Sequence, residues 1–194
     1  MSSPESLTHL EGTTVTLNPS PELPHIGPKT WKIVSKLHKR VNTVSQRDVT
    51  NGLGPPYAAG KFLCRPANPH SPNILAFMRI YKQIPISGTE FTKAPIRASQ
   101  AVKSYEPKEL TALKFLEEQG CDVIPRLLGY QLDQQDKDDI VSGFWSCSFS
   151  QGEEIRLKFR EIRKLEACGY RPCPGTRKII YDWPTQMIYV LYYH

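Results

Sequence analysis

Residues 74–81, ILAFMRIY, and residues 106–119, EPKELTALKFLEEQ, decide the fold class. The first stretch is a short apolar run after a proline-punctuated turn, and this pattern predicts a strand. The second stretch has Pro107 at a first-turn position, where the missing N–H costs nothing, and it carries three leucines at helical spacing. These are Leu110, Leu113 and Leu116. A strand with an apolar face that a following helix can cover predicts an α+β fold.

The flanking stretches predict the remainder of the sheet. Residues 60–65 show a second short strand pattern, and the turn-rich sequence ANPHSPN joins it to residues 74–81, so a hairpin with a long loop is expected. Residues 121–130, CDVIPRLLGY, form an extended segment that can add to the same sheet. We therefore expect an antiparallel sheet packed against the helix at residues 106–119.

Two N-terminal stretches differ in charge. Residues 1–28 contain five prolines and three acidic residues but no Lys or Arg, which predicts a flexible tail. Residues 29–50 are basic, and their apolar positions predict a basic amphipathic helix over residues 29–41. These positions are Trp31, Val34, Leu37 and Val41. The basic face fits a nucleic-acid or membrane surface, but we favour a solvated helix face because no aromatic or Arg cluster interleaves the lysines.

The C-terminal part predicts one more helix and a hairpin. Residues 151–168 place apolar side chains on one helical face. Residues 177–182, RKIIYD, and residues 187–193, MIYVLYY, predict two strands that form a small second layer with that helix. A terminal strand this apolar needs a cover, so self-association is one expectation.

Composition bounds the function classes. The chain has 194 residues and a formal net charge of +6, which suits one domain with tails and permits a polyanionic partner without requiring one. Five cysteines without C-x-x-C spacing predict free thiols in a reducing compartment rather than a structural zinc site. No secretory signal and no apolar run of about 20 residues is visible, so we expect an intracellular protein, cytoplasmic or nuclear, with no membrane partner.

Two loops carry weak signals for ion binding. Gly52 and Gly54 form a G-x-G with Gly60 six residues later, and glycine lets backbone N–H groups approach a phosphate, although two following prolines each remove a donor. An acidic loop after residue 130 could attract a cation, but its spacing matches no calcium loop, so we favour a solvated loop and expect no metal site. Its acidic residues are Asp133, Asp136, Asp138 and Asp139.

Four stretches carry a family resemblance. They are AFMRIYKQIP at 76–85, KSYEPKELTALKFLEEQGCDVIPRLLGY at 103–130, EIRLKFREIRKLEACGYRP at 154–172 and TRKIIYD at 176–182. Together they resemble the fungal protein-kinase-like proteins, relatives of the protein-kinase and aminoglycoside-phosphotransferase superfamily. The resemblance covers roughly residues 30–190. It implies a kinase-like small lobe over residues 29–144, made of an antiparallel sheet and one helix, and a truncated second lobe over residues 145–194.

The resemblance also implies where a nucleotide would bind. Arg79 stands in place of the phosphate-binding lysine, and Glu109 stands in place of the helix glutamate that pairs with it. An Arg for a Lys is not a conservative change, because the guanidinium fork differs in size and shape from an ammonium. Phe77 replaces a small residue that leaves room for adenine. The two interpretations of Arg79 and Glu109, a vestigial nucleotide site and an ordinary strand–helix ion pair, stay open.

Other parts of the phosphoryl-transfer machinery are missing from the sequence. No histidine begins an H-x-D motif, and no D-F-G or D-x-G occurs. Asp182 is a weak candidate for a catalytic carboxylate, although a turn residue before Pro184 is the favoured interpretation. Phe144 is expected to lead almost directly into the helix at residues 151–168, so the strand and hinge that join the two lobes would be absent.

Three functions therefore stay open. The favoured one is a catalytically inactive kinase-like module, a pseudokinase or an eroded kinase fragment, with a protein partner and weak or no nucleotide binding. The alternative is an ATP-dependent phosphotransferase that uses Arg79, Glu109 and Asp182 with ATP and magnesium. The least favoured is a basic nucleic-acid-binding protein led by residues 29–41.

Overall fold

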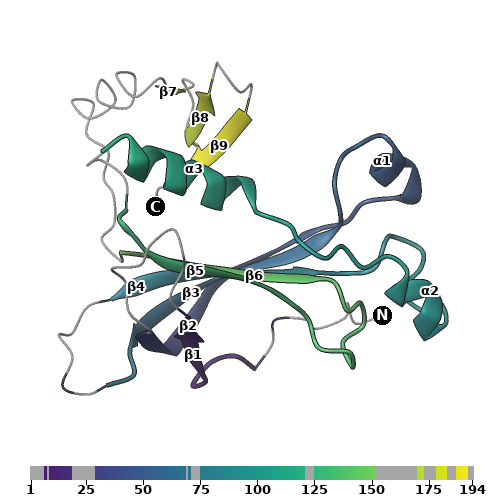
Figure 1. The fold of residues 1–194 in the computed structure, drawn as a ribbon, viewed down its shortest axis with the longest axis horizontal. Coiled ribbons are helices and arrows are strands. Elements are labelled where there is room, and N and C mark those ends of the chain that lie inside the picture. Colours follow the sequence, from purple (N-terminus) through teal and green to yellow (C-terminus); the bar gives the residue numbers. More distant parts are fainter. Residues whose placement is uncertain are drawn as a thin grey trace.

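A computed structural model describes residues 7, 9–18, 29–68, 70, 75–120, 125–151, 170–172, 178–182 and 187–191. Within this part of the chain, six antiparallel strands form one sheet in the order β1-β2-β3-β4-β6-β5 (Figure 1). The strands are β1 Thr14–Leu17, β2 Lys29–Asn42, β3 Tyr57–Pro66, β4 Ala76–Gln83, β5 Leu127–Gln134 and β6 Phe144–Gln151. A mixed α+β fold built on an antiparallel sheet is thus confirmed.

Short helices and a smaller sheet accompany the main sheet. The helices are α1 Gln46–Thr50, α2 Ala94–Ala98 and α3 Lys108–Glu118, and the smaller sheet, in the order β7-β8-β9, contains β7 Tyr170–Pro172, β8 Lys178–Asp182 and β9 Met187–Leu191. Helix α3 contacts β5 of the main sheet and also contacts β9 (Figure 1). No helix in the described part of the chain is long and apolar enough to span a membrane.

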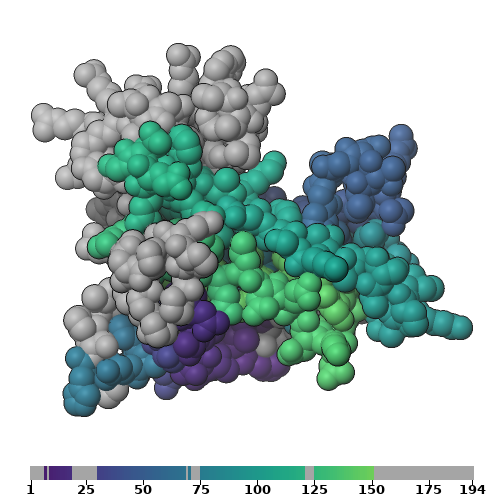
Figure 2. Space-filling view, viewed as in Figure 1, coloured from purple at the N-terminus to yellow at the C-terminus, as the bar shows by residue number. Residues whose placement is uncertain are grey.

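The hydrophobic core lies on one face of the main sheet. Phe62, Met78 and Phe149 stand opposite one another on β3, β4 and β6 and are fully buried. The sheet curls so that its two edge strands, β1 and β5, come into contact, which gives it a nearly barrel-like shape around this core. In the space-filling view, the green atoms of β5 and β6 lie between the teal atoms of the α3 segment and the purple atoms of the N-terminal segment (Figure 2).

Helix α3 covers part of the opposite face. Its buried side chains are Leu110, Ala112, Leu113 and Leu116, so the predicted leucine stripe is confirmed. The helix is tied to β5 by Glu117, whose Oε2 accepts a hydrogen bond from the Leu127 N–H at 3.3 Å. The Lys114 ammonium also lies 4.8 Å from the centroid of the Tyr130 ring on β5.

The prediction of a flexible tail over residues 1–28 is wrong for residues 9–18. These residues include β1, whose Val15 stands opposite Trp31 of β2, and Leu7 and Leu17 are buried in the core. The sequence TVTL alternates polar and apolar residues, as a half-buried strand does. Its surroundings are rich in proline and polar residues, and the pairing with β2 that stabilises it is a tertiary contact that local composition does not report.

The predicted helix at residues 29–41 is also wrong, because this segment is the long strand β2. Val34 and Leu37 are the extra residues of two β-bulges, each left without a partner on β3. A bulge adds one residue to a strand, and here the two added residues are apolar and lie three positions apart, between Trp31 and Val41. This insertion turned a strand pattern into an apparent helical spacing.

Strand β6 corrects the expectation that Phe144 leads into a helix. Residues 144–151 form a strand that pairs with both β4 and β5, so the sheet has a strand where the sequence suggested none. Phe144, Cys147 and Phe149 are buried, while the serines between them gave the stretch a polar appearance. The expected boundary between a small lobe at 29–144 and a second lobe at 145–194 therefore falls inside β6, and residues 145–151 belong to the main sheet.

Predictions for the C-terminal part have mixed outcomes. The hairpin is confirmed, since β8 and β9 pair antiparallel from Lys178 opposite Leu191 to Asp182 opposite Met187. The predicted helix at residues 151–168 falls outside the described residues beyond Gln151, the last residue of β6. The extended segment predicted at 121–130 is described from residue 125, and its strand begins at Leu127.

Candidate functional site

The structure brings Arg79 and Glu109 together on the face of the main sheet that α3 covers. Met78 and Ile80 point into the core, so Arg79, which alternates with them on β4, points to the opposite face. Glu109 lies in the first turn of α3. The Arg79 Nε lies 2.6 Å from the Glu109 Oε1, and the two side chains are 22% and 31% exposed. This is a short, partly desolvated ion pair between a strand and a helix.

Tyr81 completes the contacts of Glu109. It lies two residues after Arg79 on the same face of β4, and its hydroxyl donates a hydrogen bond of 2.8 Å to the Glu109 Oε2. Burial is the main cause that raises the pKa of Tyr81 well above its ordinary value, and the negative charge of Glu109 adds to it, while the Arg79 charge acts in the opposite direction. The hydroxyl therefore keeps its proton and remains a donor. We call these three residues the Arg79–Glu109–Tyr81 cluster.

A set of packed aromatic rings borders this cluster. The Tyr57 ring lies 5.6 Å from the Tyr81 ring and 6.0 Å from the Tyr105 ring, and the Tyr105 ring lies 4.6 Å from the Phe144 ring. These separations are in the range of favourable aromatic pairs. Burial raises the pKa of Tyr105, and its neighbour Tyr57 adds to this effect. The rings join β3, β4, β6 and the segment that leads into α3.

Phe77 and Lys61 occupy the sheet face beside Arg79. Phe77 precedes Arg79 by two residues on β4, and Lys61 of β3 stands directly opposite Arg79. The Lys61 ammonium lies 4.0 Å from the centroid of the Phe77 ring, a distance typical of a cation–π contact. The half-buried ring is thus covered on one side by a neighbouring side chain.

The three glycines of the predicted phosphate loop do not form one cradle. Gly52 and Gly54 lie in the turn between α1 and β3 with φ angles of +84° and +82°, which favour glycine. Gly60 lies within β3, where an added Cβ would come 2.7 Å from the Phe62 ring and 3.2 Å from Leu7. Gly60 is therefore required by core packing, on the opposite side of the sheet from Arg79.

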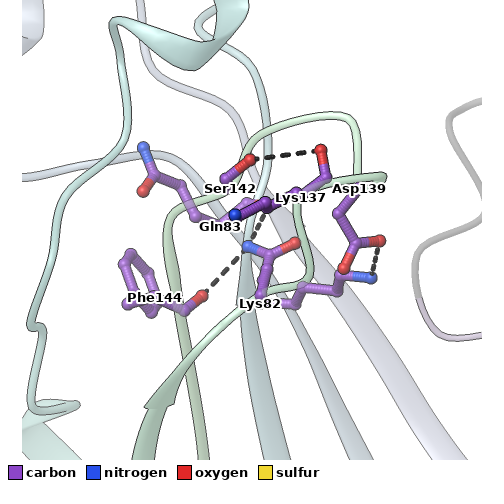
Figure 3. Close-up of polar contacts among 7 residues, drawn as sticks. Lys82, Gln83, Lys137, Asp139, Ser142 and Phe144 are labelled. Carbon is purple, nitrogen blue, oxygen red and sulfur yellow. Dashed lines mark hydrogen bonds and ion pairs between the residues drawn. The ribbon is translucent and has the colours of Figure 1, made fainter.

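The acidic loop is held by hydrogen bonds and an ion pair. Asp139 Oδ1 lies 2.5 Å from the Lys82 Nζ (Figure 3). Asp133 accepts hydrogen bonds from Gln131 Nε2 and the Gln134 N–H. Within the described ranges, no group of three or more His, Cys, Asp and Glu side chains is placed to hold a metal ion.

A buried glutamine pair anchors the same end of the sheet. Gln135 Nε2 donates to the carbonyls of Gln83 and Phe144 at 2.9 and 3.0 Å (Figure 3). The Gln83 side chain in turn donates to the Gln100 carbonyl at 2.7 Å and accepts from the Val102 N–H at 2.9 Å. These bonds fix the segment that leads from β4 to α3, and so they help to position Glu109.

Asp182, the weak catalytic candidate, lies elsewhere in the fold. It ends β8 in the smaller sheet, opposite Met187 of β9 and Tyr170 of β7, whereas Arg79 is in the main sheet. Asp182 and Met187 form the last pair of the β8–β9 hairpin, and the role of Asp182 stays a prediction.

Sequence reasoning missed Tyr81, Phe144 and Lys61 as neighbours of the candidate site. A signal for Tyr81 was present, because a residue two positions after Arg79 on a strand must share its face. Lys61 and Phe144 lie on other strands, so only the register of the sheet shows that they border the site. A scan against protein-family models, a search of curated proteins and a search of solved structures each returned no match for this chain.

Proposed function

We propose that this chain is a non-catalytic, kinase-like module that acts by binding a protein partner. The support for a kinase-like arrangement is the placement of α3 between β4 and β5, with a glutamate that bonds to a basic residue of β4. Protein kinases use such a strand–helix ion pair to organise the phosphates of ATP. The turn between α1 and β3 also contains two glycines with positive φ, a backbone conformation found in anion-binding loops.

The observation that carries the non-catalytic part is that the Glu109 carboxylate is saturated by contacts within the cluster. Both carboxylate oxygens of Glu109 already have donors, one from Arg79 and one from Tyr81. A phosphate that approached Arg79 would compete with a carboxylate at 2.6 Å. The cluster therefore suits a fixed link between sheet and helix better than an open phosphate site.

The Phe77 ring supports the same conclusion. It lies on the face of β4 that would receive a nucleotide base beside Arg79, and the Lys61 ammonium already covers it. Phosphoryl transfer further needs carboxylates to hold magnesium and to accept a proton, and the carboxylate at Arg79 is Glu109, which is engaged. A binding role needs none of these groups.

The test is a thermal melt of the full chain with and without millimolar ATP and magnesium. A ligand that binds only the folded state stabilises it by ~2.7 kcal/mol at 100 times its dissociation constant, so binding would raise Tm measurably. We expect no magnesium-dependent shift for the wild-type chain. Arg79→Met and the matched control Lys108→Met, an exposed lysine on α3, should behave alike.

An ATP-dependent phosphotransferase is the second candidate, and the Arg79–Glu109 ion pair is the observation that favours it. The same melt distinguishes the two functions. A magnesium-dependent rise in Tm that Arg79→Met abolishes and Lys108→Met retains would contradict the non-catalytic proposal and support the enzyme.

A further inference from the structure

Three adjacent strands of the main sheet contain basic residues and no acidic ones. The sequences of β2, β3 and β4 include Lys, Arg and His but neither Asp nor Glu. Both basic residues of β4, Arg79 and Lys82, are paired with acids, so the surplus charge is concentrated on β2 and β3. These two strands are neighbours in the sheet, and their pairing brings the charges together.

Strand register places like charges directly opposite one another. Lys32 of β2 stands opposite Arg65 of β3, and both are exposed. Their neighbours Ile33 and Cys64 form the next pair and are buried in the core, so Lys32 and Arg65 point to the other face. Exposed Arg40 lies on that same face, opposite Ala59. We call Lys32, Arg40 and Arg65 the basic face.

This arrangement is unfavourable for the folded chain by itself, since like charges directly opposite on a sheet are destabilising. At Arg79 the fold supplies a compensating acid from α3, Glu109. Glu11 also approaches β2, but its carboxylate accepts a hydrogen bond from the Lys36 N–H, not from Lys32 or Arg65. Lys36 stands opposite the core residue Phe62, four positions after Lys32. An acidic group from another molecule would relieve the repulsion between Lys32 and Arg65.

Exposed apolar side chains lie on the same strands as these charges. Val34 and Leu37, the bulge residues of β2, are 46% and 48% exposed. Half-buried Leu63 lies between Arg65 and Lys61 on β3, on the face opposite the core. The partner that complements such a surface carries acidic groups with apolar groups among them.

We propose that the basic face binds an acidic polypeptide segment that has apolar residues between its acidic ones. This inference deepens the proposed function and rests on it, because it gives the partner class of the binding module. A nucleic acid fits less well, since single strands are held by bases stacked on aromatic rings. Phe77, the aromatic residue beside Lys61 on this side of the sheet, already has the Lys61 ammonium over its ring.

The test measures fluorescence anisotropy of a labelled peptide in which Glu alternates with Val, titrated with the full chain. The same peptide with Ser in place of Glu and an oligothymidylate of equal length serve as comparison probes. The variant Lys32→Glu/Arg65→Glu reverses the charge of the basic face but keeps a like-charged pair, so the repulsion within the fold is matched. Lys93→Glu/Lys103→Glu makes the same change of net charge at two exposed lysines outside the three strands.

We expect the acidic peptide to bind and the Ser peptide not to. The Lys32→Glu/Arg65→Glu variant should bind the acidic peptide about tenfold more weakly, since each reversal removes an exposed ion pair and adds a repulsion. The Lys93→Glu/Lys103→Glu control should bind it as the wild type does. Thermal melts of both variants check that each is folded.

Three outcomes would overturn the inference. They are no binding of the acidic peptide, an equal loss of binding in both charge-reversed variants, and tighter binding of the oligothymidylate than of the peptide. The proposed function is judged separately by the nucleotide melt. A magnesium-dependent shift removes the non-catalytic function whatever the peptide does, whereas a failed peptide titration without such a shift removes only this partner.

Discussion

Glu109 links helix α3 to the main sheet, and each of its two carboxylate oxygens makes one contact. Its Oε1 pairs with Arg79 and its Oε2 accepts from Tyr81, so one carboxylate joins two residues of β4. Because the pair is partly exposed, solvent screening limits what it adds to stability. Its larger effect is to orient α3, and that orientation can be tested at the level of this one side chain.

Glu109→Gln should lower the free energy of unfolding by about 1 kcal/mol, because the amide keeps the shape of the carboxylate but loses its charge toward Arg79. The pKa of Tyr81 should fall, since the charge of Glu109 helps to raise it. Urea denaturation and an ultraviolet titration of tyrosinate measure the two effects. Glu118→Gln, an exposed control on the same helix, should change neither. An unchanged Tyr81 pKa in Glu109→Gln would contradict this prediction.

Cys64 and Cys147 should make the fold less stable at alkaline pH. Burial raises the pKa of both thiols from 9.0 to about 12. Above pH 9 the thiols of the unfolded chain lose their protons while those of the folded chain keep them. The free energy of unfolding therefore falls by about 1.4 kcal/mol per pH unit for each thiol as the pH rises from 9 toward 12.

The variant Cys64→Ala/Cys147→Ala isolates this effect. The free energy of unfolding of this variant at neutral pH reports any loss of packing. Above pH 9 its free energy of unfolding should decrease less steeply with pH than that of the wild type. Denaturation in urea at a series of pH values gives both slopes. Equal slopes would mean that the two thiols ionise normally in the folded chain.

Strand β2 shows how one element combines a stability cost with a surface property. Its bulges at Val34 and Leu37 shift the register with β3 after Ile33, which is buried in the core. The same register sets Lys32 against Arg65. A residue retained at a cost to stability is more informative about binding than one that merely raises the net charge.

Lys32→Glu should stabilise the protein by about 0.2–1 kcal/mol, because it replaces a like-charged cross-strand pair with an oppositely charged one. The gain should shrink as salt is added. Lys93→Glu, which changes net charge equally outside the sheet, separates the local effect from the global one. If Lys32→Glu were no more stable than Lys93→Glu in urea denaturation, the repulsion argued for β2 and β3 would be absent.

For the whole molecule, the N-terminal segment closes the curled sheet. Leu17 of β1 is 1% exposed and belongs to the core that Phe62, Met78 and Phe149 form. The contact between β1 and β5 brings the two edges of the sheet together. The segment is consequently part of the domain and contributes to its stability.

Leu17→Ala should lower the free energy of unfolding by about 2–5 kcal/mol, the usual cost of truncating a buried leucine. The control is Leu53→Ala, a leucine 68% exposed, which should change stability by no more than about 0.5 kcal/mol. Thermal or urea denaturation compares the two. A small effect of Leu17→Ala would restore the view of residues 1–28 as a tail.

Local patterns by themselves determined β4, α3 and the C-terminal hairpin. The leucine spacing of α3 and the apolar run of β4 are patterns of consecutive residues, so a short window of sequence is enough to predict each element. They also placed Arg79 on a strand and Glu109 near the start of a helix. The use of these two residues for a nucleotide stays a prediction.

Only the tertiary structure decided β1, β2, β6 and the neighbours of Glu109. The bulges of β2 need a partner strand to be recognised, and the buried residues of β6 stand among serines. Strand β1 is held by pairing with β2 across residues 18–28. The Lys61–Phe77 contact likewise depends on how β3 and β4 are aligned. Each of these features rests on strand register, a relation between segments far apart in the chain that local periodicity does not contain.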